Sequence, residues 1–151
     1  MDDDAALGQI ETEVALLMRL GEATRRATPV AAHRSLDRAA YVILRHLQDA
    51  GPQNVSALAA RLNLDGSTVT RQVSAMQRDG LVTREPDPHD GRGAVIRATR
   101  AGLNRVDAVR AARTALYGEI LADWSPGDRR ALAMLMRRLN ESLDAHTRRT
   151  R

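Results

Sequence analysis

Apolar side chains recur at helical spacing in the first third of the chain. Residues three and four apart form one seam, which predicts a helix over about residues 7–27 that ends before Pro29. The members of this seam are Leu7, Ile10, Val14 and Leu17. A second helix is expected over residues 35–49, with Ser35 as its N-cap. Its buried stripe consists of Leu36, Ala40, Ile43, Leu44 and Leu47.

Two short helices and a hairpin are expected in the middle of the chain. Apolar spacing predicts helices over about residues 56–61 and 67–79, with a tight turn over residues 63–66 between them. Strand-like runs follow at residues 81–85 and 94–98. The segment between these runs contains two prolines and two glycines, so we expect a projecting tip instead of a long ladder.

Two longer helices are expected to complete the chain. Thr99 is a suitable cap for a helix that reaches about residue 123. Ser125 is expected to cap the last helix, with Pro126 in its first turn and Asp128 three residues after the cap. The apolar stripe of the last helix consists of Leu132, Leu135, Met136, Leu139 and Leu143. The fold class is therefore mainly α, with one small β-hairpin.

The composition narrows the classes of function. The 151 residues include no cysteine, which removes disulfides, thiol catalysis and thiol redox sensing. Aromatic residues make up 2% of the chain, so it has little with which to stack on unpaired bases. No apolar run is long enough for a membrane span and no secretory leader opens the chain, so we expect a cytoplasmic protein.

All basic residues of the chain are arginines. With 23 arginines against 19 acidic residues the net charge is +4, which is modest for a nucleic-acid binder. A GC-rich genome would produce the same bias, so composition alone does not argue function. Arginine nevertheless binds phosphates and guanine edges with two hydrogen bonds, and the positions of individual arginines are informative.

The helix expected over residues 67–79 has two opposed faces. Its apolar side carries Val69, Val73 and Met76. The opposite side carries short hydroxyl side chains and arginines, with two threonines on the flanks: Ser67, Thr68, Thr70, Arg71, Ser74 and Arg78. A helix that reads DNA needs this division, because one face must seat it on the domain while the other faces the groove. Taken alone, the pattern also fits an ordinary amphipathic surface helix.

Three neighbouring features favour DNA reading. A short helix precedes this one across a four-residue turn, which is the spacing of a helix-turn-helix. Gly80 stands at the C-terminal cap and leads directly into the hairpin. The hairpin tip carries Arg92, which a narrow minor groove would attract, and Asp90, which is expected to fix the wing by pairing with an arginine. The sequence therefore predicts a winged helix-turn-helix that binds double-stranded DNA.

Each predicted DNA contact has its own role. We expect the major groove to be faced by Ser67, Thr68, Thr70, Arg71 and Ser74. Arg92 is expected in the minor groove, and His89 on the same tip is either a DNA contact or a solvated loop residue. Arg78 and Arg84 are expected to contact phosphates.

The stretch from Val55 to Gly102 resembles the winged-helix core of MarR-type transcription regulators. The resemblance rests on the motifs Ser67-Thr68-Val69-Thr70-Arg71, Gly80-Leu81-Val82, Asp90-Gly91-Arg92 and Thr99 to Gly102. The flanking helices follow the family's order, and one departure is Gly66, where many members have proline. The resemblance implies a repressor-type regulator that leaves its DNA when a small, often aromatic or anionic, effector binds.

The resemblance also implies a homodimer in which the first and last helices of both subunits interlock. The residues agree, since the apolar seams at the two ends exceed what one small winged domain can cover, although packing within one subunit is the alternative. The expected interface consists of Leu7, Ile10, Val14, Leu17, Leu132, Leu135, Met136, Leu139 and Leu143. We thus expect dimerisation helices over residues 1–34 and 101–151, a DNA-binding domain over residues 35–100, and a palindromic operator.

Other functions find less support. The four histidines, His33, His46, His89 and His146, have no metal-ligand spacing, and no phosphate loop or nucleophile elbow is present. We therefore expect no enzyme, no metal and no cofactor. Two alternatives remain, a helical dimer that only binds other proteins and a nucleoid-like DNA binder without sequence preference. Arg71 and Arg92 argue against the first, and competitor DNA separates the second.

Overall fold

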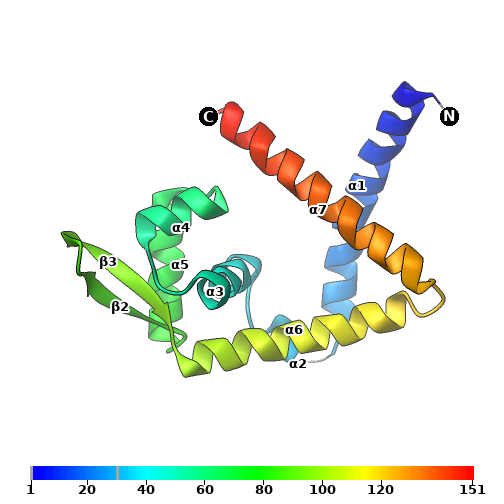
Figure 1. Cartoon of the computed structure of the whole chain (residues 1–151). Helices are drawn as coiled ribbons and strands as arrows, with labels where there is room; N and C mark the ends of the chain where they lie inside the picture. The colour runs from blue at the N-terminus through cyan, green and yellow to red at the C-terminus, as the bar shows by residue number, and fades with distance from the viewer. Residues whose placement is uncertain (1, 30) are drawn as a thin grey trace.

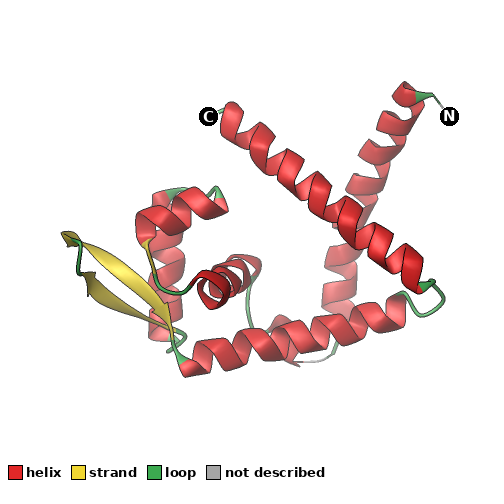
Figure 2. Cartoon of the chain, in the orientation of Figure 1, coloured by secondary structure: helices red, strands yellow, loops and turns green. Residues whose placement is uncertain are grey.

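The computed structural model describes residues 2–29 and 31–151, and the side chains of residues 33 and 34, including His33, lie outside the described part. Its elements in chain order are α1 (Asp3–Ala27), α2 (Ala31–Arg34), α3 (Arg38–Ala50), β1 (Gln53–Asn54), α4 (Val55–Leu62), α5 (Gly66–Arg78), β2 (Val82–Asp87), β3 (Asp90–Ala98), α6 (Arg100–Ile120) and α7 (Pro126–Arg149). Figure 1 shows α3, α4, α5 and the hairpin at one end of α6, and α1 and α7 at the other. The prediction of a mainly helical fold with a small β wing is confirmed (Figure 2).

One apolar core joins α3, α4, α5, the sheet and the first half of α6. Its fully buried side chains are Ile43, Leu44, Leu58, Val69, Val73, Val82, Ile96, Val106 and Val109. The stripe predicted for α3 lies in this core, which confirms it. Burying one such side chain stabilises the fold by about 1.5–3 kcal/mol, so this core is the main support for the lobe that these elements form.

The start of α3 differs from the predicted one. A helix from Ser35 with Ser35 as N-cap is wrong, because Asp37 caps α3 by accepting a hydrogen bond from the Ala40 amide at 2.7 Å. The Ser35 hydroxyl instead donates to the carbonyl oxygen of Ala32 at 3.0 Å, at the end of the short helix α2. Both residue types are suitable caps, and with Asp37 as the cap, Leu36 of the predicted stripe is buried but precedes α3.

The sheet is longer than predicted and has one more strand. β3 lies between β1 and β2 and is antiparallel to both. The expectation of a short ladder with a projecting tip is wrong, because β2 and β3 stay paired as far as Asp87 and Asp90. Pro86 is accommodated because β2 is an edge strand, where a missing N–H can face solvent. The sequence does not predict β1, whose two residues pair with Val95 and Ile96.

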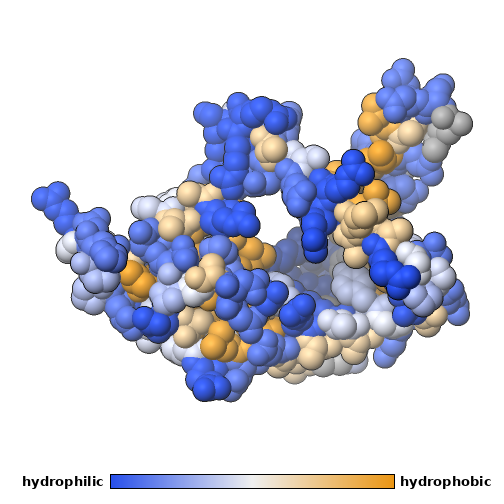
Figure 3. All heavy atoms as spheres, in the orientation of Figure 1, coloured by the Kyte–Doolittle hydropathy of each residue, from blue (hydrophilic) through white to orange (hydrophobic). Residues whose placement is uncertain are grey.

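α1 and α7 form an open arm beside the lobe. Neither helix has a buried residue, and both make only sparse contacts with the other elements of the described chain. Figure 3 shows hydrophobic side chains on this arm that are open to solvent. Within the described residues, no helix is both long enough and apolar enough to cross a membrane.

Candidate nucleic-acid interface

The lobe fixes α5 by its apolar face and by its C-terminal end. Val69, Val73 and Met76 are buried, which confirms the predicted apolar face. Gly80 follows the helix with a φ of 73°, a left-handed conformation that glycine adopts without steric cost. The Leu81 amide then donates to the Met76 carbonyl at 2.9 Å, which closes the helix end. The C-cap residue itself is Asp79, one position before the predicted one, and Gly80 is the left-handed residue that ends the helix and directs the chain into β2.

The opposite face of α5 is open to solvent. Its exposed side chains are Ser67, Thr70, Arg71, Ser74, Gln77 and Arg78, while Thr68 is half-buried at its edge. The Ser74 hydroxyl donates to the Thr70 carbonyl at 2.9 Å and therefore presents its oxygen as an acceptor. The structure thus places all the predicted major-groove residues on or beside one accessible face. Gln77 is absent from the prediction, although its distance of seven residues from Thr70 puts it on the same side of a helix.

Two aspartates shape the β2–β3 turn. Asp87 Oδ1 accepts a hydrogen bond from the His89 amide at 2.9 Å, and Asp90 Oδ1 accepts one from the Arg92 amide at 3.0 Å. The expected pairing of Asp90 with an arginine side chain is corrected, because its partner among the described residues is the backbone of Arg92. Aspartates stabilise turns in this way. The wing backbone is fixed while the Arg92 side chain stays exposed.

The predicted DNA-contacting arginines have unengaged guanidinium groups. Arg71, Arg78, Arg84 and Arg92 are exposed, and in the described part of the chain none of their side chains makes a hydrogen bond or ion pair. Arg97, which also lies on the wing, is paired with an acidic residue, since its Nε lies 3.4 Å from Glu85 Oε1. The four free groups are therefore available to phosphates and base edges.

Thr99 connects the end of the hairpin to the end of α5. Its hydroxyl donates to the Gly80 carbonyl at 2.7 Å and accepts from the Gly102 amide at 3.0 Å. The Thr99 amide donates to the Leu81 carbonyl at 3.0 Å. The predicted cap of α6 is confirmed, and the same residue sets the wing relative to α5.

A cavity of about 360 Å³ lies between α1, α3 and α6. Leu17 and Leu20 of α1, together with Leu116 and Ile120 of α6, provide an apolar wall. The sequence does not identify this group, because its members come from three helices that are distant along the chain.

Three arginines line the same cavity: Arg25, Arg38 and Arg113. The Arg113 guanidinium lies 4.5 Å from the centroid of the Tyr41 ring. Burial is the main cause that lowers the pKa of Arg113, and the charges of Arg25 and Arg38 lower it further against the opposing effect of Tyr41. Arg38 is held by Glu22 of α1, with Nη2 donating to Oε2 at 3.0 Å. Converging cations beside an apolar wall suit an amphipathic anion.

The fold and the exposed α5 face together define a winged helix-turn-helix DNA-binding protein. Residues 36–93 match the model of the MarR family. The HTH-type transcriptional regulator YxaD of Bacillus subtilis is 33% identical over 108 residues, which cover 72% of this chain and 76% of YxaD. The chain therefore belongs to the MarR family and is an HTH-type transcriptional regulator.

One further relative and one solved structure of the same fold extend the comparison. The HTH-type transcriptional repressor IacR of Pseudomonas putida is 30% identical over 82 residues, which cover 54% of this chain and 49% of IacR. The PcaV transcriptional regulator of Streptomyces coelicolor, solved in complex with its natural ligand, has the same fold with a TM-score of 0.69 at 24% identity. That match covers 85% of this chain and 91% of PcaV.

Proposed function

We propose that this protein is a homodimeric repressor that reads a palindromic operator with α5 and releases it when a small effector binds. One observation carries the proposal: α5 buries its whole apolar face and exposes a polar, arginine-bearing face beside a wing with a free Arg92. The major-groove residues in this proposal are Ser67, Thr68, Thr70, Arg71 and Ser74. Arg92 and His89 contact the minor groove, and Arg78 and Arg84 contact phosphates. The protein acts in the cytoplasm, where it meets chromosomal DNA, and performs no catalytic step.

A mobility-shift experiment tests whether the protein binds DNA with a sequence preference. DNA fragments that co-purify with the protein are sequenced, and a common fragment is labelled and titrated with protein. We expect a shift that an excess of the same unlabelled fragment reverses and that random DNA reverses only weakly. No shift at low salt would overturn the DNA-binding proposal. Equal reversal by random DNA would support a nucleoid-like binder instead.

The exposed Arg92 side chain on the wing leads to a separate prediction. We expect Arg92→Ala to weaken operator binding about tenfold without changing the melting temperature, because the exposed side chain supports no contact within the fold. Arg110→Ala is the matched control, since it removes the same charge from an exposed position on α6. Equal losses in a mobility-shift titration would show that net charge, and not a wing contact, is responsible.

The open arm supports the homodimer. Large apolar residues on both helices are more than half exposed, among them Leu7 at 57%, Leu17 at 55%, Leu135 at 53% and Leu143 at 55%. Exposed apolar surface of this extent is typical of a protein interface.

We propose that residues 1–34 and 101–151 form the dimerisation region and residues 35–100 the DNA-binding domain. The proposed seam comprises Leu7, Ile10, Val14, Leu17, Leu132, Leu135, Met136, Leu139 and Leu143. Light scattering should give twice 16.5 kDa.

The cavity between α1, α3 and α6 is the proposed effector site. IacR is a repressor, and PcaV has been solved with its natural ligand. Repression that responds to a small effector is consistent with both of these proteins. The three arginines favour an anion, and the leucines beside them favour an apolar ring or chain. A small aromatic carboxylate matches both features.

Benzoate and benzamide are matched probes for this cavity. We expect benzoate to raise the melting temperature while benzamide, which has the same ring and no charge, has little effect. Arg25→Gln should weaken benzoate binding about tenfold, because a hydrogen bond to a charged group is lost. Arg19→Gln is the control, since Arg19 is exposed on the same helix and does not line the cavity. Equal stabilisation by both probes would contradict an anion site.

A further inference from the structure

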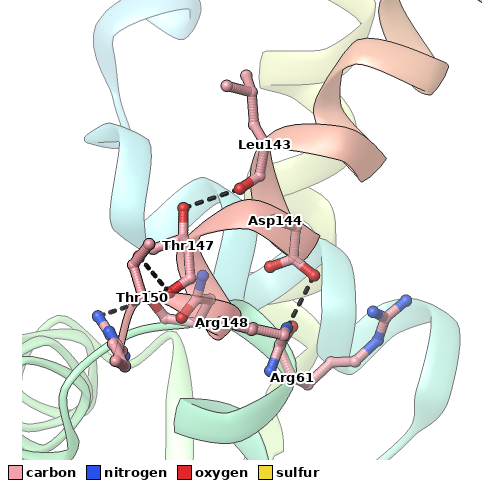
Figure 4. Close-up of polar contacts among 8 residues, drawn as sticks. Arg61, Leu143, Asp144, Thr147, Arg148 and Thr150 are labelled. Carbon is pink, nitrogen blue, oxygen red and sulfur yellow. Dashed lines mark hydrogen bonds and ion pairs between the residues drawn. The ribbon is translucent and has the colours of Figure 1, made fainter.

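The last turn of α7 lies against the turn between α4 and α5. Arg148 Nη2 donates to the carbonyl oxygen of Arg61 at 3.1 Å, across a separation of 87 residues in the chain. Arg148 Nε donates at the same time to Asp144 Oδ2 at 2.9 Å, one helical turn earlier on α7. Figure 4 shows Asp144 and Arg148 on α7 beside Arg61 of α4. One guanidinium therefore joins the end of α7 to the end of α4.

A second arginine contacts the other part of the same turn. Arg151 Nη2 donates to the Asn63 carbonyl at 3.4 Å and lies 3.9 Å from Asp65 Oδ1. Asn63 closes α4 in the left-handed conformation, with a φ of 53°. Asp65 is the residue that precedes α5. The two arginines thus reach the last residues of α4 and the first position before α5.

The chemistry of these contacts is complementary. The last carbonyls of a helix lack intrahelical partners and carry the negative end of its dipole, so a guanidinium is a suitable donor to them. The pKa of the Asp144 carboxyl is lowered, first by the hydrogen bond from Arg148 and less by Asn63 and Arg61. Asp144 is therefore ionised at neutral pH and keeps Arg148 oriented toward α4.

The start of α5 lacks strong support of its own. Asp65 stands at its N-cap but makes no side-chain capping hydrogen bond. Gly66 follows as the first helical residue, and no atom lies within 4 Å of where its Cβ would be. Glycine is conformationally flexible, and no side chain caps this helix. The first turn of α5 therefore has more conformational freedom than a capped turn that begins with another residue type. An external contact at Asp65 and Asn63 would restrict that freedom.

We propose that Asp144, Arg148 and Arg151 form a clasp that orders the α4–α5 turn and thereby couples α7 to the DNA-reading helix. α7 also carries Leu139 and Leu143, which are exposed and immediately precede the clasp. A shift of α7 in the dimer would move the clasp, and the clasp would move the start of α5. The consequence for DNA affinity rests on the proposed function, whereas the ordering of the turn does not.

Arg148→Ala and Arg149→Ala form a matched pair for the test. Both remove one positive charge from the last turn of α7, and Arg149 is exposed with no described contact to the α4–α5 turn. Amide hydrogen exchange is measured on the free, full-length protein. We expect the amides of residues 61–66 to exchange about two- to fivefold faster in Arg148→Ala than in Arg149→Ala, because the lost contact is exposed and individually modest. Operator affinity should fall by a similar factor per half-site.

Each outcome decides one part of the proposal. Equal exchange in the two variants overturns the clasp. Faster exchange in Arg148→Ala with equal operator affinity shows that the clasp orders the turn but is not coupled to DNA reading, which overturns the coupling. If the wild type binds no DNA, the proposed function fails, and the exchange comparison still decides whether the clasp exists. A melting temperature unchanged in both variants excludes general unfolding as the cause.

Discussion

Gly102→Ala is expected to destabilise the DNA-binding lobe by about 3 kcal/mol or more, because the new methyl group has no space. Its Cβ would lie 2.1 Å from the Leu81 carbonyl oxygen and 3.2 Å from Leu44 Cδ2. The nearer atom belongs to the backbone and accepts a hydrogen bond from the Thr99 amide at 3.0 Å. Relief of the clash would therefore separate α6 from the junction between α5 and β2. Chemical denaturation at constant protein concentration measures the effect.

Gly118→Ala on the same helix provides the control. No atom lies within 4 Å of where its Cβ would be, so the added methyl group meets only open space. Alanine in a helix interior is favoured over glycine by about 1 kcal/mol, and we expect a neutral or stabilised protein. A Gly102→Ala protein as stable as the wild type would show that α6 does not approach Leu81 this closely.

The sequence predicts the buried and exposed faces of α5 well because both follow the helical period. Residues 69, 73 and 76 must share a side of any helix that includes them, and all three are buried. The N-cap of α3 is Asp37 and not the predicted Ser35, so capping residues are predicted only in part. The glycine after α5 and the Thr99 cap of α6 are predicted, because Gly80 adopts the left-handed conformation and Thr99 accepts from the Gly102 amide three residues later. Features of this kind depend on residue type and spacing alone.

Features that depend on residues distant along the chain cannot be predicted from residue type and local spacing. The strand β1 has two residues and exists because Val95 and Ile96 lie beside it. The wing ladder continues past Pro86 because β2 is an edge strand, which becomes known only with the strand order. The acceptor of Arg148 in the α4–α5 turn is the backbone carbonyl of Arg61, which any residue type at position 61 would provide.

The same division applies to the candidate site. The exposed arginines of α5 follow from helical spacing, whereas the arginines of the cavity come from α1, α3 and α6 and converge only in three dimensions. The role of Asp90 lies between these cases. Its position beside Arg92 indicates a wing-stabilising residue, but its hydrogen bond is to the backbone amide and not to the guanidinium. The sequence thus indicates that Asp90 stabilises the wing, and the structure identifies the backbone amide as the group that it binds.

Arg71→Ala is expected to reduce operator affinity by about 1–3 kcal/mol per half-site and to relax the base preference there. Arg71 is exposed in the middle of the polar face of α5, and its side chain has no described intramolecular partner. Its loss should therefore leave the fold intact. In a two-fold dimer both half-sites lose the same contact, which doubles the free-energy loss. Titration of the selected fragment and of random DNA measures affinity and preference together.

Two companion variants separate base reading from charge. Arg71→Lys keeps the positive charge but lacks the planar fork that binds guanine with two hydrogen bonds, so it should retain affinity for random DNA and lose preference. Arg78→Ala removes a charge near the C-terminal end of the same helix, and a phosphate contact there predicts a uniform loss over all sequences with a shallower salt dependence. If Arg71→Ala behaves as Arg78→Ala does, Arg71 binds phosphate, and operator preference must come from the hydroxyl side chains or from DNA shape.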